Sequence, residues 1–208
     1  GIVNCTPDSF YSNSRFFGLS AVSQALNFVG EGADIIDIGG ESTRPGSDYV
    51  DEKEELSRVI PVIRSIRKIS NIPISVDTRK AAVMKAAWNE GADILNDISA
   101  LEDSLDLATF VAEKKIPVIL CHKRGIPASM QKNTEYEDIF SQVSRYLEER
   151  ASFAVNEGVL PEKIIVDPGI GFAKDFDGNI ELISKCGLLC NKKYKVLMAL
   201  SRSEERRV

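Results

Sequence analysis

Short apolar runs recur along this chain, and each of them stops at a single polar residue. The runs GIVN, ADIID, ISVD, ADILN, VILCH and KIIVD end at Asn4, Asp37, Asp77, Asn96, His122 and Asp167. A stretch in which apolar residues recur at helical spacing follows each run. The pattern therefore predicts strands and helices that alternate along nearly the whole chain.

This alternation predicts a parallel α/β fold, and repetition of one unit favours a (β/α)8 TIM barrel over an open doubly wound sheet. In such a barrel all strands point their C-terminal ends to one face, where substrate binds, so the polar run ends should converge there. The expected strands lie near 1–4, 34–38, 73–77, 92–96, 117–121, 163–167 and 195–200. The expected helices fill 19–30, 51–69, 79–90, 104–114, 135–157 and 178–188. An eight-fold barrel with these elements lacks its last helix, strand and closing helix.

An internal echo supports the repetition. The segments EGADIIDI and EGADILND begin at Glu31 and Glu90. Each is expected to close a helix at Gly32 or Gly91 and to continue into a buried strand. A third helix end, NEG, lies at 156–158.

One helix also has a recognisable start. Asp51 has the residue type of an N-cap, and Glu54 follows three positions later as a capping-box partner. We therefore expect helix 51–69 to begin there.

Composition narrows the function classes. The chain has 208 residues, 43% of them hydrophobic, which is enough for a single domain over 1–208. Its net charge is −5, its pI is about 5.1, and no Lys/Arg cluster with interleaved aromatics is present, which argues against nucleic acid or a membrane surface as partner. The longest apolar runs, about six residues, are too short to span a membrane. No secretion signal opens the chain, so we expect a cytoplasmic protein.

Cysteine and histidine usage excludes several chemistries. Cys5, Cys121, Cys186 and Cys190 lack metal-ligand spacing and are expected to be reduced, buried thiols, with the last two on one helix face. With His122 as the one histidine, neither a zinc cluster nor a Ser-His-Asp triad is easy to build. The chemistry should run on carboxylates, amides and a metal held by oxygen ligands.

Two glycine-rich loops follow expected strands. The loop GGESTRPGS at 39–47 presents Ser42, Thr43 and Arg44, which suit a phosphate-bearing substrate because guanidinium and backbone amides bind oxyanions. An ordinary glycine-rich βα turn is the alternative for this loop.

The second loop, DPGIGFAKD at 167–175, is expected to expose Phe172 and Lys174 near the mouth of the barrel. A strand-end turn packed by Phe172 is the alternative interpretation.

Three strand-end residues form the sharper set. Asp77, Asn96 and Asp167 could together bind the edge of a heterocycle such as an aminopyrimidinone, because a carboxylate accepts two parallel N–H bonds and an amide both donates and accepts. Helix capping is the alternative for each residue alone. Asp37 and Asp97 are more ambiguous and are interpreted as loop supports.

Two further strand ends carry polar groups. Asn4 offers an amide oxygen that Mg²⁺ could share with a phosphate, or it holds a turn. His122 is interpreted as a hydrogen-bonded structural residue rather than a base.

The ordered segments GIVNCTPDSF, DIIDIGGESTRPGS, ISVDTRKAAV, GADILNDISA, VILCHKRGIPASMQ and IIVDPGIGF resemble dihydropteroate synthases, from Gly1 to about Arg202. The resemblance implies a TIM barrel, dimeric when complete, that joins 4-aminobenzoate to 6-hydroxymethyl-7,8-dihydropterin diphosphate in folate biosynthesis. Pyrophosphate and 7,8-dihydropteroate would be the products, and no residue would serve as nucleophile or general base.

The resemblance also implies roles for individual residues. Pterin would bind Asp77, Asn96 and Asp167, and Mg²⁺ would bind Asn4. Ser42 and Thr43 would lie on the diphosphate side. The aminobenzoate side would be framed by Arg44, Pro45, Phe172 and Lys174.

The chain departs from the family pattern at three places. DSFYSNS stands where the family usually has DSFSDGG, and Cys121 and Lys123 flank His122 where methionines are usual. SRS at 201–203 replaces SRK, so the pterin-contacting lysine is absent, as are the last strand and its diphosphate-binding residues. We expect unpaired edge strands that favour association, and weak or no activity of this form.

Two alternatives stay open. One is a pterin-binding domain of the corrinoid methyltransferase type, which would use methyltetrahydrofolate but should not need the TPDSF and STRPG segments. The other is an inactive or binding-only relative.

Overall fold

The computed structural model describes residues 1–6, 14–42, 47–125, 131 and 133–200. Within them, seven strands form one parallel sheet in which each strand pairs with the next in sequence. The strands are β1 (Ile2–Asn4), β2 (Ile36–Gly39), β3 (Ile74–Asp77), β4 (Ile94–Asp97), β5 (Val118–Cys121), β6 (Ile164–Asp167) and β7 (Lys195–Val196). The predicted parallel sheet in sequential order is confirmed.

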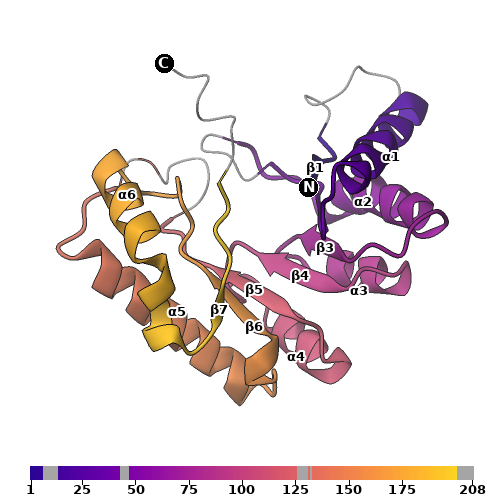
Figure 1. Ribbon diagram of the computed structural model, residues 1–208. Coiled ribbons are helices and arrows are strands. Elements are labelled where there is room, and N and C mark those ends of the chain that lie inside the picture. Colours follow the sequence, from indigo (N-terminus) through magenta and orange to yellow (C-terminus); the bar gives the residue numbers. More distant parts are fainter. Residues whose placement is uncertain (7–13, 43–46, 126–130, 132, 201–208) are drawn as a thin grey trace.

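Helices alternate with the strands and cover the outer side of the curved sheet (Figure 1). They are α1 (Ser14–Gly30), α2 (Glu52–Arg67), α3 (Ala81–Asn89), α4 (Leu105–Lys114), α5 (Ile139–Asn156) and α6 (Phe176–Lys185). Two 3₁₀ segments, η3 (Pro161–Lys163) and η4 (Cys186–Lys192), precede β6 and β7. This is the TIM-barrel-like α/β arrangement that the sequence predicts.

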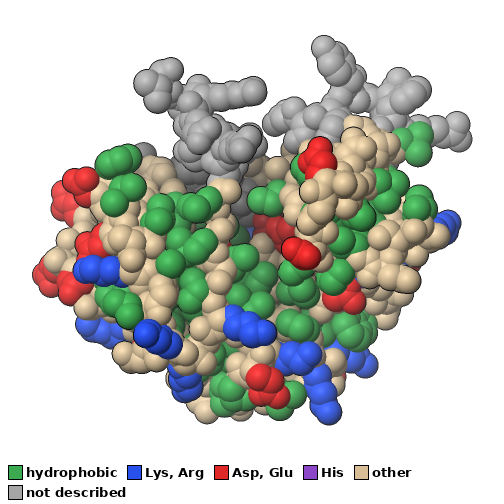
Figure 2. Space-filling model, in the orientation of Figure 1, with side chains coloured by type: hydrophobic (Ala, Val, Ile, Leu, Met, Phe, Trp, Pro, Cys, Tyr) green, Lys and Arg blue, Asp and Glu red, His purple; other side chains and the backbone are tan. Residues whose placement is uncertain are grey.

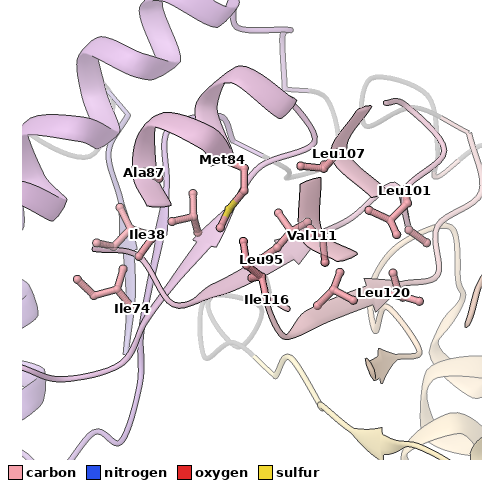
Figure 3. Close-up of a cluster of buried hydrophobic side chains, with 14 of the residues drawn as sticks. Ile38, Ile74, Met84, Ala87, Leu95, Leu101, Leu107, Val111, Ile116 and Leu120 are labelled. Atoms are coloured by element: carbon pink, nitrogen blue, oxygen red, sulfur yellow. The ribbon is translucent and has the colours of Figure 1, made fainter. Parts of the chain in front are cut away.

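The main core lies between the sheet and the helices. Successive side chains of a strand point to opposite faces, so the apolar partners in register, such as Ile38 and Val76, both face outward. Figure 3 shows Met84 and Ala87 of α3 over the strand residues Ile38, Ile74 and Leu95. The apolar runs are therefore buried by helices, and the residues that alternate with them face the inside of the curve.

The glycines of the internal echo close helices as expected. Gly32, Gly91 and Gly158 have φ between 94° and 99°, a conformation that residues with side chains rarely adopt. After each helix, the amide three residues past its end bonds back into the last turn, as from Ala92 N to Ala87 O at 2.9 Å. The same turn thus precedes three of the strands.

The start of α2 confirms the N-cap but not the capping box. The Asp51 side chain accepts a hydrogen bond from Glu54 N at 2.9 Å. The Glu54 carboxylate pairs with Arg58 one turn later instead of reaching back. Arg58, four residues later on the same helix face, is therefore the partner of the Glu54 side chain.

Three helix boundaries differ from the expected ones by three residues or more. α1 begins at Ser14, five residues early, and α5 begins only at Ile139, because Asp138 is its N-cap and accepts from Ser141 N at 2.9 Å. α6 ends at Lys185, and Cys190 has φ 47° and ψ 36°, so the two C-terminal cysteines do not share a helix face. All four cysteines are free thiols; Cys186 is partly exposed and the other three are buried.

No helix in the described ranges is long and apolar enough to cross a membrane. On the face in Figure 2, Lys and Arg side chains are scattered along the lower rim and do not gather in one patch.

Candidate active site

Strand register brings the polar run ends together. Asn4 pairs with Gly39, Gly39 with Asp77, and Asp77 with Asn96, so these four residues form one row across β1 to β4. The sequence prediction that these strand ends converge is confirmed for this row. Asp167 pairs with Cys121 and lies two residues beyond the same row on β6, on the same face of the sheet.

Gly39 leaves a gap in the row. A Cβ added there would lie 3.4 Å from the Asp77 Cβ and 3.5 Å from one of its carboxylate oxygens. A side chain at this position would therefore stand directly in front of the Asp77 carboxylate.

The Asp77 carboxylate has no hydrogen-bond donor among the described residues. Burial, followed by the charges of Asp37 and Glu55, raises the pKa of Asp77 well above its ordinary value. The residue does not cap the next helix, whose N-cap is Lys80. A partly buried carboxyl without such donors is a group that a ligand with two N–H groups would satisfy.

Asp37 orients the side chain of Asn96. Its Nδ2 donates to both carboxylate oxygens of Asp37, at 3.3 and 3.4 Å. Burial raises the pKa of Asp37, and the neighbouring side chains of Ser75 and Asn96 oppose that shift. Because the amide nitrogen is held, the Asn96 side-chain oxygen is left as an acceptor next to Asp77.

Asp167 shapes its own loop. Its Oδ1 accepts from Gly169 N at 2.7 Å, and burial raises the pKa of this carboxyl to about 6. Its other oxygen has no partner among the described residues, so Asp167 can both hold the turn and accept from a ligand.

Asp97 is a structural residue, as the loop-support interpretation held. Its carboxylate is fully buried and accepts from Ser99 N, Ser99 Oγ and Leu101 N, at 2.7, 2.7 and 2.8 Å. The turn that it holds contains Ala100 and Leu101, with φ of 49° and 65°.

The expectation that Lys174 is exposed near the mouth of the barrel is wrong. Lys174 is buried, with its Nζ 3.0 Å from His122 Nδ1 and donating to the carbonyl oxygens of Gly169 at 2.9 Å and Phe172 at 2.8 Å. The loop carbonyls draw the ammonium inward because they supply the acceptors that burial would otherwise deny it. Phe172 is half-buried.

Backbone contact explains why the β5 and β6 loops are so close. Gly169 has φ 67°, and an added Cβ would overlap the carbonyl oxygen of His122. His122 also packs edge-on against Tyr146, with ring centroids 4.9 Å apart. The interpretation of His122 as a bonded structural residue is confirmed.

We expect His122 to make stability pH-dependent. Burial, then the charges of Lys174 and Arg124, lower its pKa from 6.5 to about 3. Between these values the unfolded chain binds a proton that the folded chain refuses, so stability falls as pH drops below 6.5. Between pH 7 and pH 4, the free energy of unfolding of the native protein should fall by roughly 2–3 kcal/mol more than that of His122→Asn.

Urea unfolding of both proteins at pH 7, 5.5 and 4 measures this difference. Asp167 and the other buried carboxyls titrate in both proteins and cancel in the comparison. Equal pH dependence of the two proteins would contradict the assignment.

The β2 loop lies partly outside the described residues, and with it Thr43, Arg44 and Pro45. Ser42 is described, and its carbonyl oxygen accepts from Ser47 Oγ at 2.5 Å.

A buried ionic group behind this loop escaped sequence analysis. Lys80 Nζ contacts Glu41 and Glu55, and Arg79 bridges Glu41 and Asp103. The partners are up to 39 positions apart in sequence. The sequence signal for this group is Glu41 in GGEST, since a charged residue in a glycine-rich loop needs a partner.

The described ranges contain no group of three or more His, Cys, Asp or Glu placed to hold a metal ion. A metal in this site would have to take its ligands from single residues, substrate and water.

Known proteins resemble the chain over nearly its full length. A family model described as "Pterin binding enzyme" matches residues 1–205. Dihydropteroate synthase of Synechocystis sp. is 44% identical over 203 residues, which is 97% of this chain and 70% of the relative. Dihydropteroate synthase of Haemophilus influenzae is 43% identical and is covered to 74%.

Solved structures of dihydropteroate synthases also resemble the fold of this chain. The Xanthomonas albilineans dihydropteroate synthase with 4-aminobenzoic acid superposes with a TM-score of 0.90 at 39% identity, covering 100% of this chain and 76% of that one. The same enzyme in complex with 7,8-dihydropteroate gives a TM-score of 0.85 at 35% identity, with the same coverage.

Proposed function

The chain belongs to the dihydropteroate synthase family of pterin-binding enzymes, and from this premise we propose how its residues condense 6-hydroxymethyl-7,8-dihydropterin diphosphate with 4-aminobenzoate. The observation that carries the proposal is the row at the strand ends, in which the partly buried Asp77 carboxylate, without a donor among the described residues, stands beside Asn96. The relatives named above are all dihydropteroate synthases, which disfavours the methyltransferase alternative.

Asp77, Asn96 and Asp167 bind and orient the pterin in this proposal. The Asp77 carboxylate accepts the two parallel N–H groups of the aminopyrimidinone edge, and the Asn96 side-chain oxygen accepts a further one. Asp167 uses the oxygen that is not bonded to Gly169. Three acceptor residues fixed on β3, β4 and β6 hold the ring in a single orientation.

The reaction breaks the bond between the pterin methylene carbon and the diphosphate oxygen. The electron pair leaves with pyrophosphate, the dihydropterin ring stabilises the methylene cation, and the 4-aminobenzoate nitrogen attacks it and loses a proton. No protein nucleophile is required. The chain contributes position and charge stabilisation, because buried acceptors near the ring favour a developing cation.

The amine enters from the side framed by the β2 and β6 loops. From the resemblance to the family, we assign Ser42 and Thr43 to the leaving group and Arg44, Pro45 and Phe172 to the aminobenzoate. Lys174 contributes by holding the carbonyls of the β6 loop, so that Phe172 keeps its place.

Mg²⁺ fits at Asn4 as a shared ion. The Asn4 amide has no side-chain partner among the described residues, and its oxygen is a hard donor at the end of β1. When bound, the ion would neutralise charge on the departing diphosphate. Asn4 would hold it together with substrate oxygens and water.

Replacing Asn4 with alanine should raise the Mg²⁺ concentration for half-maximal activity about tenfold, because one protein ligand is lost. Activity titrated with Mg²⁺ at saturating substrates measures the change. Glu31→Ala, an exposed site between α1 and β2, is the control. A metal dependence equal to that of the native chain would remove Asn4 from the metal site.

Two further features belong to the proposal. Free thiols support a reducing, cytoplasmic location. The exposed apolar side chains of Phe176, Ile180 and Leu188 support a homodimer, because such residues commonly mark interfaces. Sedimentation analysis of the chain over a range of concentrations tests the dimer.

The decisive test is release of pyrophosphate by the purified chain with Mg²⁺ and dihydropterin diphosphate. Release that requires 4-aminobenzoate supports the proposed synthase. Release that continues without it indicates hydrolysis only, and absence of release under both conditions contradicts activity of this chain.

A further inference from the structure

A buried ionic network lies behind the strand-end row and has no part in the proposed chemistry. Lys80 is 8% exposed, and its Nζ contacts one carboxylate oxygen each of Glu41 and Glu55. Arg79 donates to the other Glu41 oxygen at 2.7 Å and to Asp103 at 2.8 Å. Five charged groups from four separate segments therefore meet in one place.

Such a network is costly to bury. Glu55 is 1% exposed, and its second oxygen, Oε1, has no hydrogen-bond partner within the described part of the chain. Removing charges from water is unfavourable for each ion, and apolar replacements often give equal or greater stability. Stability alone is thus a weak reason for this arrangement, whereas fixing the relative position of segments is an attested one.

The segments that it joins are the loops at the active face. Glu41 directly precedes Ser42 in the loop after β2, while Arg79 and Lys80 follow β3 just beyond Asp77. Asp103 comes from the segment after β4. One network thus ties together the ends of three consecutive strands.

Further contacts fasten the β2 loop on both sides of residues 43–46. Arg58 Nη1 donates to Gly40 O at 2.7 Å, and Ser47 Oγ to Ser42 O. Farther along, the Tyr49 ring lies 4.7 Å from Lys80 Nζ and 5.2 Å from the Arg79 guanidinium carbon. Lys80 and Arg79 therefore contact the β2 segment both before and after this stretch.

The network is also next to the pterin-side carboxylate. Glu41, Glu55 and Asp77 line one small cavity of about 10 Å³, together with Thr78, Arg79 and Ile98. Three members of the network therefore share a cavity wall with Asp77, and we infer that the network acts through the loops that it holds.

We propose that Lys80 and Glu41 are positioning residues that fix the β2 loop against the β3 loop and thereby set the affinity for 4-aminobenzoate. This inference rests on the proposed function, because that function places Arg44 and Pro45 of the same loop at the aminobenzoate. In this proposal Lys80 and Glu41 act through the loops that they hold, without a role for direct contact with substrate.

Hydrogen exchange tests the positioning without any need for activity. In Lys80→Met, which keeps most of the side-chain volume, the peptide covering 40–50 should exchange at least tenfold faster than in the native chain. The turn at Gly91 should be unchanged. Glu90→Gln, which breaks the exposed pair with Arg64, is the control and should leave the 40–50 peptide unchanged.

Steady-state kinetics test the consequence. Lys80→Met and Glu41→Gln should raise the KM for 4-aminobenzoate about tenfold and leave the KM for the dihydropterin diphosphate within about twofold. If a single variant unfolds, the combination of Glu41→Gln, Glu55→Gln and Lys80→Met leaves no unpaired buried charge. This triple variant is then used in place of the single variant in both experiments.

The outcomes separate the two proposals. Unchanged exchange of the 40–50 peptide overturns the positioning role, whether or not the chain is active. Faster exchange with equal shifts of both KM values overturns the link to 4-aminobenzoate. A native chain that is inactive but shows the exchange difference contradicts the proposed function and leaves the positioning of the loop established.

Discussion

Replacing Asp77 with alanine should abolish binding of the dihydropterin substrate. Two charge-assisted hydrogen bonds to a partly buried carboxylate contribute together roughly 3–5 kcal/mol, which corresponds to a loss of about 150- to 5000-fold in affinity. Calorimetric titration with the dihydropterin diphosphate measures the loss directly. Asp77→Asn should lose nearly as much, because an amide cannot accept from both N–H groups through two oxygens.

The same change should not weaken the fold. The Asp77 carboxylate has no donor among the residues that the structure describes, and burial together with neighbouring carboxylates disfavours its charge. Asp77→Ala should therefore unfold at the same or a higher temperature than the native chain, as expected of a residue retained for binding. Asp34→Ala, an exposed change just before β2, is the matched control for both measurements. Unchanged pterin affinity in Asp77→Ala would remove this residue from the binding site.

Asp97 should behave in the opposite way. Asp97→Ala leaves three buried donors without an acceptor and releases a turn with two left-handed residues, so the free energy of unfolding should fall by roughly 3–5 kcal/mol. Urea unfolding measures the loss. Asp97→Asn keeps one acceptor oxygen and should lose about half as much.

The comparison of Asp77 with Asp97 is informative because both end neighbouring strands. A loss below about 1 kcal/mol in Asp97→Ala would show that the turn is held by other contacts. Together, the two substitutions should separate a carboxylate that serves a ligand from one that serves the fold.

Much of the fold was predictable because local signals repeat. Apolar runs of strand length and glycines at helix ends set the order of elements, and the positive φ of Gly32 and Gly91 shows why those glycines end helices. The boundaries that sequence analysis missed depend on caps and kinks. Asp138 starts α5 later than apolar spacing suggests, and the backbone at Cys190 interrupts the helical path.

The site was predictable only in part. Strand ends could be counted in the sequence, so the row with Asp77 and Asn96 was within reach. The burial of Lys174 depends on carbonyl groups of a folded loop, and the pairing of Lys80 with Glu41 joins residues that only the sheet brings together. Long-range pairs of this kind have no periodic signature in the sequence.

The alternation of faces within β2 and β3 has a consequence for how these strands can evolve. The residue types at Ile38 and Val76 are constrained by packing against the helices, whereas those at Gly39 and Asp77 are constrained by what occupies the inner face. Adjacent codons are therefore under unrelated selection. A library that randomises the outward positions can retune the thermal range of the protein while its chemistry stays fixed, and a library of the inward positions can search for new ligands on an unchanged scaffold.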